Sequence, residues 1–417
     1  MTINKHENVQ NTLLYAGIYV LLITGSTSAY SLTLNEAVTQ QLGFGPDNQP
    51  CYNLLGSDTA SLVLTGSLAS ICNRSPSFSG PVGSSSSGGS AATSIYLPKI
   101  LQQHLKRFQN GDTGGGAGDD INNVTGLGSG WTGFFSGEYQ SLDRSISAFE
   151  DGYRSDVGVV TAGVDKQFAH NLLAGAAFSY SRQSGNFIGA GDFGNDSYGI
   201  LTYALFKPIE NAYIQLNAGY AFRNYQRNRL ASYTDVDITT GLPTIFSGFA
   251  ESDYDGHDFQ ASILTGYDFN FGGLTISPRA GFNWTKNNYD SYDEQGGSGL
   301  ELRFDDDHRT SLQTSFGVLA NYAFSTSFGV LVPQFSADWI HEFHNNQRNI
   351  RVSFLGDTRN QQFAFQNERP DRDFMEFTAG TSMVLPNGIQ TFVNYRGWAG
   401  HNYFDSHGVS AGVRMEF

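Results

Sequence analysis

The sequence has 417 residues and a formal net charge of -15, with 15% charged residues, 14% aromatic residues and 49 glycines. This acidic balance argues against nucleic acid as a partner, and beyond the N-terminus no apolar run is long enough to predict a membrane-spanning helix. A transmembrane β-barrel is compatible with the mean hydropathy of -0.29, because lipid-facing and lumen-facing residues alternate along its strands.

The first 29 residues have the pattern of a secretory signal peptide. Lys5 and His6 precede the apolar run 13–23, and a stretch of small residues ends at Ala29. An apolar run of this length is too short for a permanent membrane anchor, and cleavage is expected near Ala29. Residues 1–29 therefore predict export across the inner membrane.

Residues 30–90 form a short segment that contains the two cysteines of the chain, Cys51 and Cys72. In an oxidising compartment these thiols are expected to pair as a disulfide. Helices are predicted within 32–42 and within 59–72. A metal site needs more ligands than this cysteine pair offers, so no metal and no cofactor are predicted.

Residues 91–127 are predicted to be a linker with one helix in it. A Gly/Ser-rich tether over 79–92 precedes it, and this composition is expected to stay flexible because it cannot bury apolar area. Apolar side chains recur at helical spacing over 94–110, and Pro98 suits the first turn of a helix there. The apolar positions are Leu97, Leu101, Leu105 and Phe108. A second glycine-rich tether, 111–130, follows.

From Trp131 onward the apolar period is two, which is typical of β-strands. Ile214 and Leu216, for example, lie on one face of a strand, and Gln215 and Asn217 lie on the other. Each predicted strand is close to the nine to eleven residues that a tilted strand needs to cross a bilayer. The predicted strands are 131–140, 156–168, 172–184, 195–206, 212–224, 257–269, 274–286, 311–324, 329–343, 373–385, 389–399 and 407–417.

The connections between these strands alternate in length. Tight turns such as AHN, KPIEN, NFGG, STSF and PNG alternate with long polar loops. An even number of strands with short turns at one rim and long loops at the other predicts an all-β fold, a twelve-stranded antiparallel transmembrane barrel. In hydrocarbon every backbone group must be paired, so the last strand is expected to pair with the first. The long loops are 141–155, 185–194, 225–256, 287–310, 344–372 and the shorter 400–406.

The alternation also assigns side chains to the lipid or to the lumen. In the last strand, every second residue from Val409 to Phe417 is predicted to face lipid, whereas Arg414 and Glu416 face the lumen. The other charged residues assigned to the lumen are Arg279, Glu342 and Arg396. Glu342 is expected to pair with an inward arginine such as Arg396, so the interior should be polar and partly charge-paired.

Three stretches near the C-terminus, 329–343, 371–397 and 408–417, resemble the β-domain of type V secretion autotransporters, as do 156–168 and 172–181. The resemblance covers about residues 128–417, the predicted barrel domain. It implies insertion into the outer membrane by the barrel-assembly machinery, which in this family reads the terminal aromatic, here Phe417. It also implies periplasmic chaperones and a helix inside the pore, for which 94–110 is the candidate. The exported passenger of the family is usually far longer than residues 30–90.

Four short motifs could suggest a catalytic function, and each also has a purely structural interpretation. GDTGG at 111–115 resembles a protease nucleophile loop but is expected to be a spacer. DDDH at 305–308 suggests an outer-membrane protease but is expected to be a solvated acidic loop. Asn122–Asn123 is expected to be part of the linker. His341–Glu342 is expected to be structural packing near the rim of the barrel. No catalytic residue and no enzyme activity are therefore predicted.

These observations predict an outer-membrane translocator of a Gram-negative bacterium that exports and displays its own short N-terminal segment, with its loops outside. Its expected partners are outer-membrane lipid and lipopolysaccharide, the barrel-assembly machinery and periplasmic chaperones. The alternative is a surface structural or binding protein that uses its long loops, and a third hypothesis is a hydrolase built on those loops.

Overall fold

A computed structural model describes residues 33–43, 51–72, 79–83, 130–236 and 242–416. The predicted signal peptide, the predicted helix 94–110 and Phe417 lie outside these ranges. Within them, no helix combines the length and the apolar character that crossing a membrane requires.

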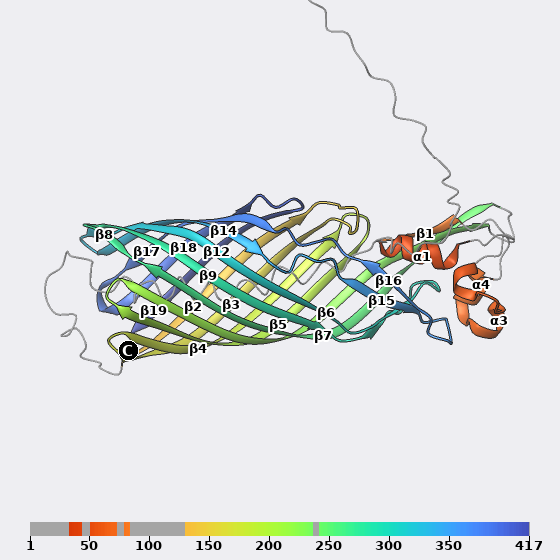
Figure 1. Ribbon diagram of the computed structural model, residues 1–417, viewed down its shortest axis with the longest axis horizontal. Helices are drawn as coiled ribbons and strands as arrows, with labels where there is room; N and C mark the ends of the chain where they lie inside the picture. Colours follow the sequence, from red (N-terminus) through yellow and green to blue (C-terminus); the bar gives the residue numbers. More distant parts are fainter. Residues whose placement is uncertain (1–32, 44–50, 73–78, 84–129, 237–241, 417) are drawn as a thin grey trace, which may run out of the picture. The chain divides into compact units, whose positions relative to one another are not determined.

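Twelve antiparallel strands form a closed barrel (Figure 1). β19 (Phe404–Glu416) pairs with β2 (Trp131–Arg144) along its whole length, and this pairing closes the ring. Because a closed ring leaves no strand edge unpaired, its backbone meets the requirement of a hydrocarbon environment. The twelve-stranded barrel predicted from the sequence is confirmed. The other barrel strands are β3 (Tyr153–Ala169), β4 (Leu172–Phe187), β5 (Gly191–Ile209), β6 (Ala212–Val236), β7 (Pro243–Tyr267), β9 (Leu274–Tyr289), β12 (Asp307–Tyr322), β14 (Gly329–Glu342), β17 (Asp373–Val384) and β18 (Ile389–Ala399).

The two faces of the barrel wall differ in polarity. In β2 the polar side chains of Ser136 and Gln140 are buried on the inner face, whereas Phe135 and Tyr139 on the outer face are 53% and 56% exposed. Large apolar side chains are exposed along the other strands in the same way, as with Phe316 of β12. An apolar outer face and a polar interior are what a transmembrane barrel needs.

The connections separate the two rims of the barrel. Short turns lie at one rim, called here the turn rim, together with the start of β2 and the end of β19 (Figure 1). At this rim β8 (Phe269–Phe271), β13 (Phe324–Thr326) and the 3-10 turn η2 (Pro386–Gly388) extend the hairpins. The long connections lie at the opposite rim, called here the loop rim.

The longest predicted loop, 225–256, is mostly strand, so that prediction was wrong. β6 and β7 stay paired from Ala212–Tyr267 to Val236–Pro243 and extend well beyond the other strands. The residues of this extension are largely polar, and they do not show the lipid–lumen alternation that marks a membrane-crossing strand. Outside the bilayer a strand does not need that alternation, which is why the pattern did not reveal it.

Two other predicted loops, 287–310 and 344–372, contain a small four-stranded sheet. Its strands are β10 (Tyr292–Asp293), β11 (Leu302–Phe304), β15 (Asn349–Phe354) and β16 (Gln362–Gln366), in that order. We call this sheet, together with the extension of β6 and β7, the loop platform. One side of the platform is apolar and buried, as Val352 and Phe354 show with no exposed surface.

The described residues between 33 and 72, which are 33–43 and 51–72, form four short helices, called here the cap segment. They are α1 (Leu34–Leu42), α2 (Tyr52–Leu55), α3 (Ala60–Val63) and α4 (Gly66–Cys72). Thr33 and Glu36 form a capping box that starts α1. The predicted helix over 59–72 is interrupted, because Leu64 bridges to Asp357 of the loop platform and Gly66 adopts a positive φ of 60°.

A disulfide joins Cys51 and Cys72, with a Cα–Cα distance of 5.5 Å. Both cysteines are buried. The bond connects the residue before α2 to the end of α4, so it fixes the ends of a chain segment whose helices have only four to seven residues each.

The tether after the cap segment is not free along its whole length. β1 (Ser79–Gly83) pairs with the outer part of β6, from Ser79–Thr234 to Gly83–Ala231. The expectation of a flexible tether was therefore wrong for these five residues. An unpaired strand edge readily accepts another strand, and the extended edge of β6 does so here.

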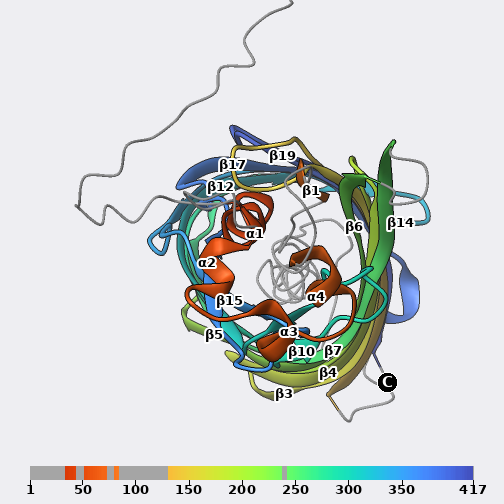
Figure 2. The same cartoon turned by 90° about the vertical axis from the view of Figure 1, so that its right-hand side faces the viewer.

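The cap segment and the loop platform share one hydrophobic core. Viewed from the loop rim, the four helices lie in front of the barrel mouth (Figure 2). The buried side chains of the cap segment are Leu34, Ala37, Val38, Leu42, Cys51, Leu54, Leu55, Ala60, Leu64, Leu68, Ile71 and Cys72, and those of the platform are Ala231, Tyr233, Leu300, Leu302, Phe304, Ile350, Val352, Phe354 and Phe365.

Candidate functional site

Buried ion pairs line the lumen. Arg279 of β9 donates to both carboxylate oxygens of Asp338 of β14, at 2.8 and 2.5 Å. Arg396 of β18 pairs with Glu138 of β2 across the strand that closes the barrel. Each pair is largely withdrawn from water, so each charge depends on its partner. The structure thus places Arg279 and Arg396 on the inner wall with acidic partners.

Glu342 is buried near the loop rim, but its partners differ from the one expected. Its carboxylate accepts hydrogen bonds from Ser311, from Gln313 and from the backbone N–H groups of Leu312 and His344, at 2.5 to 3.1 Å. The expected pairing with Arg396 is wrong. Strand register explains this, because Arg396 is level with Ser336 of β14, about 20 Å along the strand from Glu342.

Arg414 and Glu416 lie at the turn rim. Arg414 is buried and contacts Glu416 at 3.0 Å, Thr132 at 3.1 Å and Asp165 at 3.8 Å. Asp165 also accepts a hydrogen bond from Tyr203 at 3.0 Å. The side chain of Glu416 is 45% exposed, so it marks the boundary between the lumen and the solvent at this rim.

One part of the inner wall is apolar, in contrast to the ion pairs around it. We call this cluster the lumen patch. It runs over the inner faces of β2, β4, β5, β6 and β7. A patch of this kind in a wet lumen can bind the apolar face of a helix. Its residues are Phe134, Leu173, Ala177, Leu201, Tyr203, Leu205, Tyr213 and Leu264.

Two aspartates of the acidic motif at 305–308 form ion pairs with arginines. Asp305 pairs with Arg351 at 3.2 Å, and Asp307 pairs with Arg348 at 2.6 Å. Among the residues that the structure describes, no three His, Cys, Asp or Glu side chains are arranged to hold a metal ion. Charge pairing within the loop platform accounts for both of these aspartates.

His341 lies on the outer face of β14 at the loop rim. Its Nδ1 is 2.8 Å from Asp373, and its ring contacts Trp339 and Phe343. Aromatic residues at this height are typical of the interfacial girdle of a barrel. His341 therefore belongs to the membrane interface and lies on the face of the wall opposite to Glu342.

The contacts between the cap segment and the loop platform include a polar anchor. Arg359 donates to the backbone oxygens of Leu54 and Leu55 and to the carboxylates of Asp58 and Asp357. The anchor therefore fixes the cap segment both through its main chain and through a charged side chain. Charge-assisted bonds of this kind are stronger than neutral ones.

The same contact includes two close approaches of glycine backbone. A Cβ on Gly356 would lie 2.8 Å from the Cβ of Leu68, and one on Gly299 would lie 2.6 Å from the Cβ of Ser67. Both glycines belong to the loop platform, and both partners belong to α4. The surfaces are therefore in close contact as well as apolar.

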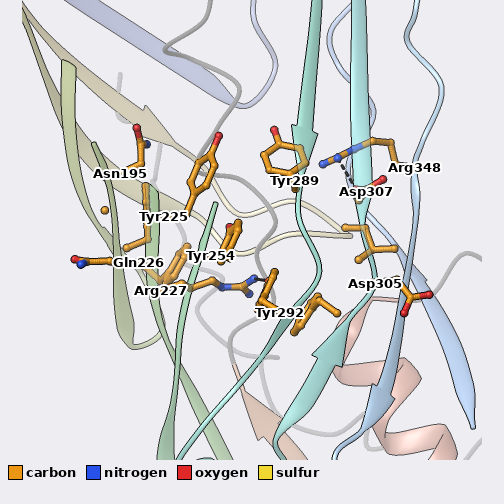
Figure 3. A pocket seen from close by; sticks show the side chains of 15 residues that line it. Asn195, Tyr225, Gln226, Arg227, Tyr254, Tyr289, Tyr292, Asp305, Asp307 and Arg348 are labelled. Atoms are coloured by element: carbon orange, nitrogen blue, oxygen red, sulfur yellow. Dashed lines mark hydrogen bonds and ion pairs between the residues drawn. The ribbon is translucent and has the colours of Figure 1, made fainter. Parts of the chain in front are cut away.

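A pocket lies near the loop rim between the barrel wall and the loop platform (Figure 3). Its volume is about 60 Å³, and aromatic side chains form most of its lining. Two arginines, Arg227 and Arg348, also reach it. Sequence analysis missed this pocket, because its residues come from six separate segments and no local motif connects them.

A closed twelve-stranded barrel with an apolar outside, an ion-paired lumen and an N-terminal segment folded at its loop rim defines an outer-membrane barrel of the translocator class. The comparison with known families agrees. The model of the autotransporter beta-domain matches residues 131–396, and the chain belongs to this family.

Solved structures share the fold. The translocator domain of the autotransporter NalP from Neisseria meningitidis superimposes with a TM-score of 0.54 at 13% identity, covering 78% of this chain and 98% of that one. The beta domain of the Bordetella autotransporter Brka gives a TM-score of 0.50 at 17% identity, covering 69% and 99%.

Two curated relatives are similar in sequence. Lipase 1 of Photorhabdus luminescens is 24% identical over 264 residues, which is 62% of this chain and 38% of the relative. Esterase EstA of Pseudomonas aeruginosa is 22% identical over 306 residues, which is 69% of this chain and 43% of the relative. The chain thus spans about two fifths of the length of these relatives.

Proposed function

We propose that this barrel exports its own N-terminal segment and keeps it at the cell surface as a folded cap. One observation supports the proposal most directly. The last described residue before the linker, Gly83, pairs with Ala231 at the loop rim, whereas the first strand after the linker begins at Trp131 at the turn rim. Residues 84–129, which include the predicted linker 91–127, therefore connect opposite rims of the barrel.

A linker of this composition can connect the two rims only along a wet path. Residues 84–129 are rich in glycine and serine and include six charged residues, and such a chain cannot cross hydrocarbon outside the barrel. We propose that it passes through the lumen, with the helix predicted over 94–110 placed against the lumen patch. The apolar side chains Leu97, Leu101 and Leu105 match a patch of leucines and aromatics.

Retention at the surface is supported by the shared core. The helices of the cap segment have four to nine residues, which is too short for stable isolated helices in water. About forty residues are also too few for an independent core without additional constraints. We propose that the cap segment folds on the loop platform and remains there, and that this folding outside the cell gives export its direction.

The proposal also covers the orientation of the barrel, its assembly partners and its lipid contacts. The loop rim faces outward, the barrel-assembly machinery reads Phe417, periplasmic chaperones accompany the unfolded chain, and lipopolysaccharide contacts the outer wall. The curated relatives are named a lipase and an esterase, but we propose that this chain transports and displays its segment and catalyses no reaction.

A cysteine-labelling experiment on intact cells tests the topology. Leu62 in the cap segment is 80% exposed, Ile146 at the loop rim is 60% exposed, and Phe168 at the turn rim is 64% exposed. We expect a membrane-impermeant maleimide to label the Leu62→Cys and Ile146→Cys variants in intact cells. The Phe168→Cys variant should react only after the outer membrane is permeabilised. Export of the segment would be disproved if Leu62→Cys behaved like Phe168→Cys while Ile146→Cys was labelled.

A second candidate function, ligand binding at the loop rim, is favoured by one specific observation. The guanidinium of Arg227 is buried at the pocket near this rim and is not engaged by a carboxylate in the part of the chain that the structure describes.

A further inference from the structure

The walls of this pocket are a stack of aromatic rings. Tyr225 and Tyr254 stack at a centroid distance of 4.9 Å, Tyr254 and Tyr292 at 4.1 Å, and Tyr292 and Phe304 at 4.6 Å, all within 15° of parallel. The stack joins β6 and β7 of the barrel to β10 and β11 of the loop platform. Because each ring packs on the next, the pocket is preformed, as binding sites usually are.

Arg227 of β6 reaches this pocket with a guanidinium that is not fully satisfied. The residue is 7% exposed. One nitrogen lies 3.5 Å from the hydroxyl of Tyr292, and the guanidinium carbon is 5.8 Å from the ring centre of Phe304. Its Nε and Nη2 have no hydrogen-bond partner among the residues that the structure describes. Burying a cation in this state is costly, so the site needs an anion that the residues described by the structure do not supply.

The two acidic residues in the lining of the pocket have other partners. Asp307 pairs with Arg348, and Asp305 accepts hydrogen bonds from Arg351 and Gln362. Both aspartates line the same pocket as Arg227, yet neither is bonded to it in the described structure. The pocket therefore offers donors to a ligand in addition to those that the platform uses for itself.

Two further residues with hydrogen-bond donors line the same pocket (Figure 3). The Nε of Arg348 and the hydroxyl of Tyr225 are buried and have no partner in the described part of the chain. Burial raises the pKa of Tyr292 to about 12, so its hydroxyl stays protonated at neutral pH. Residues with hydrogen-bond donors thus line the pocket from β6, from the segment before β15 and from β10.

We infer that this pocket is a binding site for an oxyanion group, a carboxylate or a phosphate, borne by a small molecule outside the cell. The inference rests on the second candidate function and is independent of export. The planar guanidinium of Arg227 suits two acceptor oxygens on one group. A volume of about 60 Å³ is well below the roughly 300–1,000 Å³ of a pocket that encloses a whole small-molecule ligand. The pocket therefore takes the anionic group itself, and the rest of the ligand extends out of it.

The test uses the full chain purified in detergent and three small probes that each carry one methyl group. Acetate and methyl phosphate represent the two oxyanions, and acetamide is their uncharged counterpart. Saturation-transfer NMR on the methyl signal measures binding of weak ligands to a large particle. We expect saturable binding of acetate, methyl phosphate or both, and none of acetamide. The probe that binds more tightly shows whether the anionic group of the natural ligand is a carboxylate or a phosphate.

Arg227→Gln is the diagnostic variant, and Arg303→Gln is its matched control. Arg303 lies on the same platform and pairs with Asp293, but it does not line the pocket. We expect Arg227→Gln to weaken oxyanion binding at least about tenfold and Arg303→Gln to leave it unchanged. Arg227→Lys should keep part of the affinity, because it keeps the charge.

A stability measurement separates a binding role from a structural one. If the pocket is an anion-binding site, the positive charge of Arg227 has no counter-charge in the protein without ligand. Arg227→Gln should then raise the melting temperature of the protein without ligand, because it removes an uncompensated buried charge. The inference would be overturned by equal binding of acetamide, by the absence of saturable binding to the wild type, or by equal binding to Arg227→Gln. Should Arg227→Gln fail to fold, Tyr225→Phe, which removes only one donor, gives the same comparison with a smaller loss.

Discussion

Phe354→Ala should release the cap segment from the loop platform while the barrel stays intact. Phe354 lies in β15, has no exposed surface and belongs to the core shared with the cap segment. Removing a buried phenylalanine costs about 3–5 kcal/mol, including the cavity that is left. Since about 1.4 kcal/mol corresponds to a factor of ten, the released fraction should rise by roughly two to four orders of magnitude.

Native-state proteolysis on intact cells measures this release. An antibody against residues 33–72 should detect the cap segment in wild-type cells after protease treatment and should lose its signal in Phe354→Ala cells. Leu62→Ala is the control within the cap segment, because Leu62 is 80% exposed and should keep wild-type resistance. The barrel of each variant should keep its resistance to unfolding in detergent.

Two outcomes would refute this reasoning. If the cap segment of Phe354→Ala is as resistant as that of the wild type, the cap segment folds without the platform. If the barrel unfolds together with the cap segment, the platform is a part of the barrel's own stability and the two units cannot be separated as we propose.

Two further predictions concern the same end of the molecule. Replacing both Cys51 and Cys72 by alanine should cost the cap segment about 3 kcal/mol, the value for a closed loop of this size, and should make it protease-sensitive on intact cells; unchanged resistance of the wild type in reductant would contradict this. Partial burial raises the pKa of Asp371, but the hydrogen bonds from His401 and Asn402 lower it by a larger amount, so the net pKa is below the usual value. The contribution of Asp371 to stability is therefore fully present above about pH 4 and is lost as the pH falls through the lower folded value; hydrogen exchange around His401 should increase in acid in the wild type and should show little pH dependence in Asp371→Asn.

The membrane-crossing part of the fold could be predicted from sequence because the bilayer imposes a simple rule on it. Each strand must present apolar residues to lipid and can present polar residues to the lumen, so period two is visible in strands such as β6 and β12. The same rule placed Arg279, Arg396 and Arg414 on the inner wall, where they are buried. It could not give their partners, because the partner depends on strand register as well as on the face.

The part outside the membrane could not be predicted, because no such rule acts on it. The extension of β6 and β7 and the strands β10, β11, β15 and β16 have apolar residues on the side that meets the cap segment, but these stretches have two to six residues in the small sheet. Periodicity over so few residues is not distinguishable from a loop. The pocket was missed for a related reason, since its donors come from distant segments.

The loop platform and the cap segment also explain each other's composition. The platform presents Val352, Phe354 and Phe365 on one side, and an apolar surface of this kind on loops outside the bilayer would promote aggregation if it stayed exposed to water. The cap segment, in turn, has too few residues and too short helices to bury Leu54 and Leu68 alone. The apolar side of the platform and that of the cap segment therefore require each other. Release of the cap segment would leave both apolar surfaces in water, which is the physical reason to expect that the cap segment stays where it folds.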